Sequence, residues 1–388
     1  MTKNLGVGLI GYGIGKVHAH AWKNIPLFYD QSDLPAVPKL IGIAARDRAK
    51  TLEMKENFGF SRSYSDWKEL VRDPEVEVVD NCAPPNLHLE SCTAAAEAGK
   101  AMICEKPLAR TADEAYEMYR AARSSNTVGM SGFTVRFAPA VLLAKNIIDC
   151  GQLGKVLNIR CCYMNIESGY NGYLDPNYPL HWHFDPKLAG HGAITDLGSH
   201  ALDMACFLLG EVTEVCGATQ TVIQERPVAE GSSRKGKVSV DDVSVATLKF
   251  KSGALGTIDA SWVAAGVKDF FYFEVHGSEG ALRFDFERLT ELQVALKDSS
   301  GQQGFKTIIA TSKEIPGMDK FWTDQAGGFT WDHLFVVELK YFLDWVAKDK
   351  MPDSTAPSFR DGYINSLLID SVVESSESGR WIKIEPKT

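Results

Sequence analysis

The sequence predicts an α/β protein with two domains: a doubly wound parallel sheet, then an α+β domain with a mostly antiparallel sheet. Three observations lead to this fold class. A glycine-rich turn at residues 11–15 joins an apolar strand to a helix. Apolar strand-like runs alternate with helical segments until about residue 130. After about residue 151, segments alternate apolar and polar residues, as in a sheet with one buried face. We therefore expect domains at residues 1–130 and 131–388.

The first strand and turn favour dinucleotide binding. Residues 5–10 read as a buried parallel strand, with a helix from about Val17. In a Rossmann turn the first glycine permits the bend, and the second lets a pyrophosphate approach the backbone at the helix N-terminus. The third glycine of G-x-G-x-x-G would stand at Lys16, but Gly15 comes one residue early. Any tight strand-to-helix turn could contain such glycines. The predicted cofactor contacts here are Gly11, Gly13, Ile14 and Gly15.

The second strand bears on which dinucleotide binds. It is expected at residues 39–45, and NAD-preferring Rossmann sheets place an acidic residue at its end to bind the ribose. Ala45 stands there instead and is followed by Arg46. Arg46 could contact the 2′-phosphate of NADP, or it could simply be solvated. The expected cofactor is therefore NAD or NADP, with Arg46 as a candidate contact.

The carboxyl ends of the next two strands bring polar residues to one edge of the sheet. These strands are expected at residues 76–82 and 101–104, and such edges bind ligand in parallel sheets. His88 is interpreted as a helix-start residue lining the cofactor cleft rather than as a proton carrier. Lys106 could hold a substrate hydroxyl and lower its pKa, or it could only pair with Glu105. The predicted cofactor contacts at this edge are Pro84, Asn86, His88, Glu105 and Lys106.

The remaining elements follow from periodicity. Further helices of the first domain are expected at residues 49–57, 66–72, 89–98 and 111–124, with a strand at 128–133. Strands of the second domain are expected at residues 156–164, 213–223, 243–250, 254–262, 270–276, 280–285 and 291–295. Residues 224–239, rich in Gly, Ser and charge, are interpreted as a mobile connection. Helices at residues 332–346 and 359–374 would close the second domain and could pack back on the first.

Residues 188–203 combine glycines, a carboxylate and an imidazole. Asp196 and His200 are four residues apart, and apolar residues recur at helical intervals up to Leu209. One helix should therefore present both side chains on one face. A carboxylate beside an imidazole fixes the ring and raises its pKa toward that of a useful general base. The alternative is an exposed ion pair, because such pairs are common and weak.

Composition excludes several classes of partner. The 388 residues are 45% hydrophobic and 23% charged, and the formal net charge is -9. This acidic balance, without a Lys/Arg cluster, argues against nucleic-acid binding. No apolar run approaches membrane-spanning length and the first residues do not match a secretory signal, so we expect no membrane contact and a cytoplasmic protein. The eight cysteines lack C-x-x-C spacing and are interpreted as reduced core residues. A small neutral substrate fits best.

Three motifs occur in order along the chain: the glycine turn, Glu105-Lys106-Pro107, and Asp196-Leu197-Gly198-Ser199-His200. Together they resemble the Gfo/Idh/MocA family of NAD(P)-dependent sugar and inositol dehydrogenases. The similarity runs nearly end to end, through residues 151–156 and Asp241-Asp242. Within the family, residues 179–203 look most like levoglucosan-type and related pyranose dehydrogenases. The combined pattern is specific, whereas each motif alone is not.

This resemblance implies a Rossmann domain joined to a larger open β-sheet domain, with the active site in the cleft. It implies Lys106 as the catalytic lysine, Asp196 as the orienting carboxylate and His200 as the general acid/base. His200 would take the hydroxyl proton while hydride leaves the same carbon for the nicotinamide, and Lys106 would stabilise the developing alkoxide. The family also implies a homodimer or homotetramer formed through the outer face of the second sheet.

The sequence departs from the family pattern in three places. His191 replaces the middle glycine of a common G-G-G. Residues 134–136 are Thr-Val-Arg where Asn-Tyr-Arg is frequent, and Ala83 and Pro85 stand where Thr and Asn are usual around Pro84. These departures affect substrate choice and nicotinamide packing more than the reaction class. Arg136 is expected among the substrate contacts.

His181 and His183 are two apart, so both could face a cleft from an extended segment. With His191 and Asp185 they could form a zinc site, but nothing fixes the ligand geometry and the lysine–histidine chemistry needs no metal. No metal is therefore expected. Recognition of sugar hydroxyls is the better interpretation, although loop aromatics could merely cover a helix. The expected substrate contacts are Lys106, Arg136, His181, Trp182, His183, Asp196 and His200, with Trp182 offering a face to the pyranose.

The expected function is an NAD(P)-dependent dehydrogenase that acts on a secondary hydroxyl of a cyclic sugar, anhydrosugar, glycoside or inositol. One alternative is a glycoside-cleaving enzyme that retains NAD, oxidises, eliminates and re-reduces, and so releases aglycone without net NADH. Another is a non-catalytic sugar-sensing protein on the same fold. A pure binder has no need of a positioned proton acceptor, so Lys106, Asp196 and His200 argue against it.

Overall fold

The computed structural model describes residues 3–298, 303–321, 328–350 and 353–388. The chain forms two compact units. The first comprises Met1–Ala109, Asp113–Phe137 and Thr311–Tyr363, and the second comprises Arg110–Ala112, Ala138–Ala310 and Ile364–Thr388. The sequence predicts domains at residues 1–130 and 131–388, with C-terminal helices that could pack back on the first, and residues 311–363 group with the first unit. That segment contains helix α9 (Trp331–Lys348), which packs against α1 (Gly15–Phe28).

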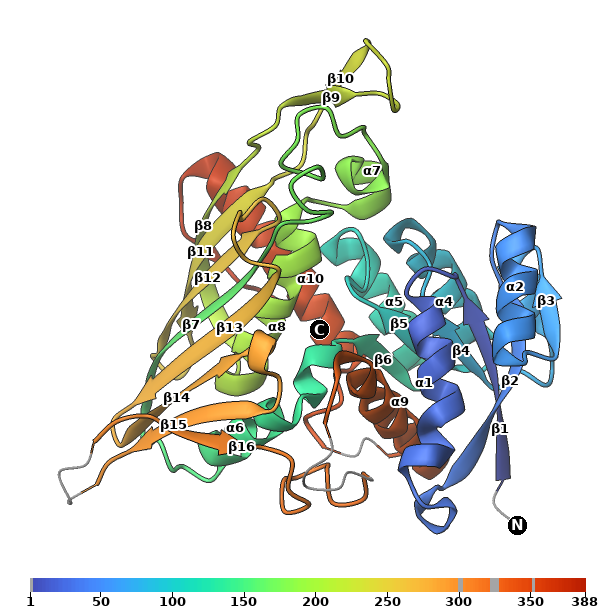
Figure 1. The fold of residues 1–388 in the computed structure, drawn as a ribbon, viewed down its shortest axis with the longest axis horizontal. Helices are drawn as coiled ribbons and strands as arrows, with labels where there is room; N and C mark the ends of the chain where they lie inside the picture. The colour runs from blue at the N-terminus through green and yellow to red at the C-terminus, as the bar shows by residue number, and fades with distance from the viewer. Residues whose placement is uncertain (1–2, 299–302, 322–327, 351–352) are drawn as a thin grey trace. The chain divides into compact units, whose positions relative to one another are not determined.

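The first unit is built on a parallel sheet with the strand order β3-β2-β1-β4-β5-β6 (Figure 1). This is the order of a Rossmann fold, in which ligands bind beyond the carboxyl ends of the strands where the order reverses, here between β1 and β4. The predicted parallel sheet is confirmed, but β3 was not predicted. The strands are β1 Lys3–Ile10, β2 Ala36–Ala44, β3 Arg62–Tyr64, β4 Val78–Asn81, β5 Ala101–Glu105 and β6 Gly129–Gly132.

Helices connect these strands. Asp47 and Asp66 begin two of them, because each carboxylate accepts hydrogen bonds from the backbone amides of the first turn. β1 is buried from Leu5 to Ile10, as a parallel strand covered on both faces should be. Besides α1 and α9, the helices of this unit are α2 Arg48–Phe58, α3 Trp67–Arg72, α4 His88–Glu97 and α5 Ala112–Ser124.

The second unit is built on a large mixed sheet with the strand order β16-β15-β14-β13-β7-β12-β11-β8-β17. β7 and β12 run parallel, and the other neighbouring strands in the described chain run antiparallel. Inward residues alternate as predicted, with Phe271, Phe273 and Val275 buried along β13. The strands are β7 Val156–Asn165, β8 Val212–Gln220, β11 Val243–Phe250, β12 Leu255–Ser261, β13 Asp269–Gly277, β14 Gly280–Asp285, β15 Glu291–Leu296, β16 Lys306–Ile309 and β17 Ile382–Lys383.

The helices of the second unit include one that carries a predicted site residue. α8 (Ser199–Leu209) packs against β7 and β12. α10 (Phe359–Ser378) lies mostly in this unit, and α6 (Pro139–Asp149), which the sequence analysis did not predict, precedes β7. Residues 224–239, interpreted from the sequence as a mobile connection, contain two short strands, β9 (Glu225–Pro227) and β10 (Lys235–Lys237), that pair as an antiparallel ribbon.

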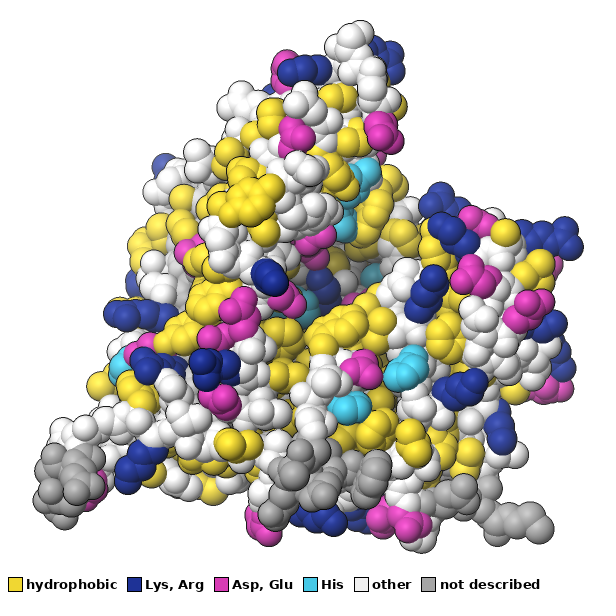
Figure 2. Space-filling model, viewed as in Figure 1, with side chains coloured by type: hydrophobic (Ala, Val, Ile, Leu, Met, Phe, Trp, Pro, Cys, Tyr) yellow, Lys and Arg dark blue, Asp and Glu magenta, His cyan; other side chains and the backbone are white. Residues whose placement is uncertain are grey.

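The surface is mixed in charge. On the face drawn in Figure 2, dark-blue basic side chains and magenta acidic side chains are interspersed. This distribution agrees with the modest negative net charge of the chain. None of the described helices combines the length and the apolar character that crossing a bilayer requires.

Candidate functional site

The glycine turn after β1 has the local geometry of a phosphate-binding turn. Gly11 has a φ of 97°, and a Cβ there would lie 2.4 Å from the carbonyl oxygen of Cys82. A Cβ at Gly13 would meet no described heavy atom within 4 Å, so the backbone at this position can be approached closely. A Cβ at Gly15 would lie 2.8 Å from a Leu9 methyl carbon, so Gly15 supplies the close helix–strand contact one residue earlier than the usual spacing.

Helix α1 begins at this turn without a side-chain cap. Among the described residues, its N-cap Ile14 makes no side-chain hydrogen bond and its first turn contains no acid. The positive end of the helix dipole therefore fits a pyrophosphate. The turn fits the phosphate end of NAD or NADP, and a bound dinucleotide would supply a hydride acceptor.

The end of β2 carries basic rather than acidic groups. Ala45 follows the strand, Arg46 is exposed, and Asp47 is used as the cap of α2. Lys50, which the sequence analysis did not single out, places its Nζ 2.9 Å from the hydroxyl of Tyr12 in the glycine turn. Lys50 is thus a basic residue beside the turn, and Arg46 follows the strand β2, whose last residue Ala44 accepts a hydrogen bond from the backbone N–H of Gly11.

His88 joins the loops that follow β4 and β5. Its Nε2 lies 2.7 Å from the carbonyl oxygen of Ala83, and its Nδ1 lies 3.1 Å from the carbonyl oxygens of Pro107 and Leu108. Burial lowers the pKa of His88, although these carbonyls oppose the shift. The fully buried ring therefore supports the two loops from inside the unit, while the predicted contacts Pro84 and Asn86 are half-buried.

Glu105, predicted as a cofactor contact, turns its carboxylate into the unit. One oxygen lies 3.0 Å from Nε2 of His18, and the other accepts a 3.1 Å hydrogen bond from the backbone N–H of Lys106. Lys106 itself is half-buried at the carboxyl end of the strand. The structure therefore keeps Lys106 at the predicted sheet edge and gives Glu105 the task of holding its backbone.

Among the described residues, one group could hold a metal ion by proximity: His18, Asp80 and Cys82, with ligand atoms within 4.8 Å of one another. All three are buried. Burial lowers the pKa of His18, but the Asp80 charge and hydrogen bond outweigh it and raise that pKa well above its ordinary value. Burial raises the pKa of the Cys82 thiol. Because metal ligands must be deprotonated, we interpret this group as a buried ion pair.

Glu338, on α9, is a buried carboxyl near this ion pair. Both of its oxygens are buried away from solvent. Burial raises the pKa of Glu338 well above its ordinary value, and the negative charge of Glu105 adds to the effect. A carboxyl whose pKa is raised by folding lowers the stability of the folded state at high pH. The reason is that the same carboxyl ionises more readily in the unfolded chain.

Replacing Glu338 with glutamine should therefore raise the melting temperature at about pH 8 by ~1–3 °C and change it little at about pH 3.5. At the lower pH the carboxyl is mostly neutral in both states, so the amide brings no advantage. Thermal unfolding of both proteins at the two pH values measures the difference. An equal change at both pH values would contradict the interpretation of Glu338 as a neutral buried acid.

In the second unit, the segment with Asp196 and His200 is not one regular helix. Ile194–Gly198 forms a π-helical turn before α8 begins at Ser199. Such turns are rare and often lie at functional sites, and the four-residue spacing alone could not predict one. Asp196 is half-buried in this turn and His200 is 8% exposed in the first turn of α8.

Asp241 holds the start of this segment. Its carboxylate accepts hydrogen bonds of 2.8 Å from the backbone N–H groups of Gly192 and Ile194, and one of 2.6 Å from the Ser244 hydroxyl. Its carbonyl accepts another from Ala193 at 2.9 Å. A Cβ at Gly192 would lie 1.9 Å from that carbonyl oxygen, so the close approach requires glycine.

Replacing Asp241 with asparagine should destabilise the fold by about 2 kcal/mol, because an amide presents one acceptor oxygen where two amides and a hydroxyl need acceptors. Since the π-turn would shift, turnover should also fall, by about tenfold. Ser244→Ala, which removes one donor but leaves the carboxylate, is the matched control and should lose less of both. Wild-type turnover in D241N would show that Asp241 does not position the π-turn.

Tyr163 packs against His200 and is itself held by Asp269, and neither residue is among those predicted from the sequence. The Tyr163 ring lies 5.4 Å from the His200 ring between centroids, and its hydroxyl donates a 2.7 Å hydrogen bond to Asp269. Burial raises the pKa of Tyr163 well above its ordinary value, and Asp269 and Asp196 add to the shift. Alternation alone predicted the strands but not that β13 begins opposite the end of β7, which brings Asp269 to Tyr163.

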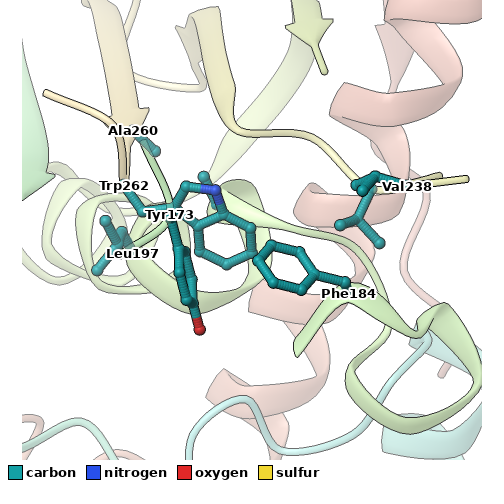
Figure 3. Close-up of a cluster of buried hydrophobic side chains, with 8 residues drawn as sticks. Tyr173, Phe184, Leu197, Val238, Ala260 and Trp262 are labelled. Atoms are coloured by element: carbon teal, nitrogen blue, oxygen red, sulfur yellow. The ribbon is translucent and has the colours of Figure 1, made fainter. Parts of the chain in front are cut away.

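The predicted substrate residues 181–183 lie beside an aromatic cluster. Figure 3 shows Tyr173, Phe184 and Trp262 close together, with Leu197 of the π-turn in the same buried group. The ring centroids of Tyr173 and Trp262 are 5.1 Å apart, nearly perpendicular. This shared core links the loop that carries residues 181–183 to the turn that carries Asp196.

The three predicted side chains of this loop differ in their surroundings. Burial is the main cause that lowers the pKa of His181 to about 4, and the positive charges of His183 and Arg226 lower it further. The ring is therefore neutral near pH 7. Nδ1 of His183 forms a short hydrogen bond with the Tyr173 hydroxyl. Trp182 is 40% exposed. Trp182 is therefore the member of this group that is open to solvent.

Arg226, in β9, ties residues 224–239 to the loop that carries residues 181–183. Its side chain is fully buried and donates hydrogen bonds to the backbone carbonyls of Tyr173 and Asp175. The guanidinium carbon also lies 4.5 Å from the centre of the Phe184 ring. The short ribbon thus anchors both ends of the loop that carries residues 181–183.

Two further residues considered in the sequence analysis, Arg136 and His191, each lie close to an aspartate. Arg136, in the first unit, is 2% exposed, and its Nη2 lies 3.9 Å from an oxygen of Asp361. His191 pairs at 3.0 Å with Asp370. The structure thus places the glycine turn, Lys106 and Arg136 in the first unit, and Asp196, His200 and residues 181–183 in the second.

Two family models match the chain. One, described as an oxidoreductase family with an NAD-binding Rossmann fold, matches residues 5–133. The other, described as the GFO/IDH/MocA C-terminal domain, matches residues 141–283. The two matches follow the order of the parallel and mixed sheets along the chain.

Similar proteins cover the chain from end to end. Levoglucosan dehydrogenase of Pseudarthrobacter phenanthrenivorans is 38% identical over 98% of both chains. Myo-inositol 2-dehydrogenase of Thermotoga maritima is 30% identical, also over 98% of both chains. Among solved structures, a levoglucosan dehydrogenase in complex with NADH and levoglucosan matches with a TM-score of 0.92 and 39% identity, over 99% of this chain and 100% of that chain.

Proposed function

The chain belongs to the Gfo/Idh/MocA family of oxidoreductases, and from that premise we propose that it oxidises a secondary hydroxyl of a cyclic sugar, anhydrosugar, glycoside or inositol. Hydride would pass to NAD or NADP. The observation that carries the proposal is the 38% identity to levoglucosan dehydrogenase over 98% of both chains. A levoglucosan-like anhydrosugar is the substrate we favour.

Three residues carry the proposed chemistry. The ammonium group of Lys106 donates to the substrate oxygen and stabilises the negative charge that develops on it. His200 takes the hydroxyl proton. Asp196 orients the imidazole of His200 and stabilises its charged form. The buried surroundings of His200 support this role, because interactions with a charge are stronger where water is excluded.

We further propose that Trp182 and His183 recognise the sugar. The exposed face of Trp182 suits stacking on the apolar face of a pyranose ring, and His183 is held in place by Tyr173. His181 supports this pair from the aromatic cluster. Arg136, being almost fully buried, would act on the substrate site mainly through its neighbours.

The finer properties of the enzyme are also proposals. Arg46 and Lys50, with no acid at position 45, favour acceptance of NADP beside NAD. The alternating mixed sheet of the second unit suits assembly into a homodimer or homotetramer.

The test is a panel of levoglucosan, inositols, aldoses and simple glycosides, each with NAD and with NADP, followed by the absorbance of the reduced nicotinamide. Net reduction with a cyclic polyol supports the proposal, and comparison of the two dinucleotides assigns the role of Arg46. Release of aglycone from a glycoside without net reduction would replace the proposal with the redox-neutral glycosidase. Tight dinucleotide binding with no turnover of any member would replace it with a sensor.

A further inference from the structure

We propose that His18 is a positioning residue for Lys106, which it reaches through Glu105 from the helix that begins at the dinucleotide turn. The proposal rests on the function proposed above, in which Lys106 is catalytic. It adds a residue that touches neither substrate nor nicotinamide but fixes the strand end from which Lys106 projects.

The connection consists of two hydrogen bonds in series. Nε2 of His18 lies 3.0 Å from Oε1 of Glu105, and Oε2 of Glu105 accepts the backbone N–H of Lys106 at 3.1 Å. The first joins α1 to the carboxyl end of β5, and the second fixes the peptide group from which Lys106 departs. A carboxylate held at both oxygens cannot rotate freely, so the peptide that it binds is held as well.

The other ring nitrogen of His18 is equally committed. Nδ1 lies 3.0 Å from both oxygens of Asp80 on β4, and Asp80 is itself fixed by a 2.7 Å hydrogen bond from the indole N–H of Trp22. The ring of Phe335 lies 5.2 Å from the His18 ring between centroids. His18 therefore spans two neighbouring strands from α1, and its side chain is fully buried.

Charge supports this arrangement. A neutral imidazole has one N–H, whereas both nitrogens of His18 face carboxylates, so only the imidazolium satisfies both. Burial lowers the pKa of His18, but the charge of Asp80 outweighs burial and raises it well above its ordinary value. This direction agrees with a charged ring. Hydrogen bonds between charged groups in a buried place are strong and directional.

The chain also makes room for the carboxylate. At Gly132, which lies opposite Glu105 where β6 pairs with β5, a Cβ would lie 2.9 Å from Oε1 of Glu105 and 3.2 Å from its carboxyl carbon. A larger residue there would push the carboxylate away from His18. Because misplacing a reacting group by about 1 Å can cost up to about 100-fold in rate, loosening this connection should be visible in turnover.

A pair of variants separates the two bonds of His18. The amide nitrogen of glutamine can take the place of Nε2, and that of asparagine can take the place of Nδ1. His18→Gln should therefore keep the bond to Glu105, whereas His18→Asn should keep the bond to Asp80 and lose Glu105. Both variants remove the cation and should destabilise the fold comparably.

We expect H18N to lower kcat by about 10- to 100-fold with little change in the KM for the sugar, and H18Q to retain most of kcat. Melting temperature and NADH affinity, measured on the same preparations, report folding and dinucleotide binding. Equal kcat in the two variants, whether both are low or both normal, would overturn the proposal, since a purely structural role does not distinguish the two nitrogens.

The double variant H18N/K106A tests the route. If His18 acts through Lys106, H18N should lower kcat far less in the K106A background than in the wild type. An undiminished effect would overturn the proposal. Full activity in K106A alone would instead reject the catalytic role of Lys106, so the two failures are distinguishable.

If H18N does not fold, the variant Gly132→Ala provides the same measurement, because it displaces the Glu105 carboxylate without removing a hydrogen-bond partner. Unchanged kcat in G132A would then count against the proposal.

Discussion

Replacing Lys106 with alanine should lower kcat/KM for the true substrate by ~10²–10³-fold. The ammonium group is the charge proposed to stabilise the developing alkoxide, and this interaction strengthens as the reaction proceeds. kcat should therefore fall much more than the KM rises. Steady-state kinetics with the best substrate of the panel measures the loss.

Two further measurements make the Lys106 result specific. Lys68→Ala removes an exposed lysine of the same unit and should leave turnover unchanged. Lys106→Arg keeps the positive charge but replaces a compact ammonium with a wider planar group, so it should recover only a small part of the activity. Full turnover in K106A would remove Lys106 from the mechanism.

The second large effect is expected at His200. Replacing it with alanine should lower kcat by ~10²–10⁴-fold, the range that general acid–base groups contribute. Activity of the wild type should decline on acidification because a protonated imidazole cannot accept the hydroxyl proton, and this decline should disappear in H200A. The pH dependence of kcat in both proteins provides the measurement.

A matched control for this variant exists in the same sheet unit. His276→Asn changes a partly exposed histidine of β13 that pairs with Glu274, and it should leave both kcat and its pH dependence unchanged. If H200A kept the acid decline of the wild type, a different group would be the proton acceptor.

The fold could be predicted where local pattern and packing agree. The apolar runs of β1, β4 and β5 and the alternation of β11 to β15 determined their faces, because burial on one or both sides leaves a clear period. The glycine turn was also predictable, since Gly11 is required by backbone geometry. Asp196, His200 and Lys106 were identified from motifs whose residue types suggest chemistry.

What supports these residues could not be predicted, because it depends on distant partners. Asp241 holds the π-turn from another part of the chain, and buried Arg226 ties the segment 224–239 to the backbone of a distant loop. His18 reads from sequence as an ordinary helical histidine. Its importance follows from β4 and β5, which bring Asp80 and Glu105 to its two nitrogens.

The return of residues 311–363 to the first unit has a consequence for the order in which the chain folds. During synthesis the parallel sheet can assemble early, but the side of α1 that packs against α9 stays uncovered until α9 has left the ribosome. By then β7 has met its partners β12 and β13, which lie far along the sequence. Maturation of the two units is thus interleaved, and a fragment ending near residue 130 would expose apolar surface that only late-made chain can cover.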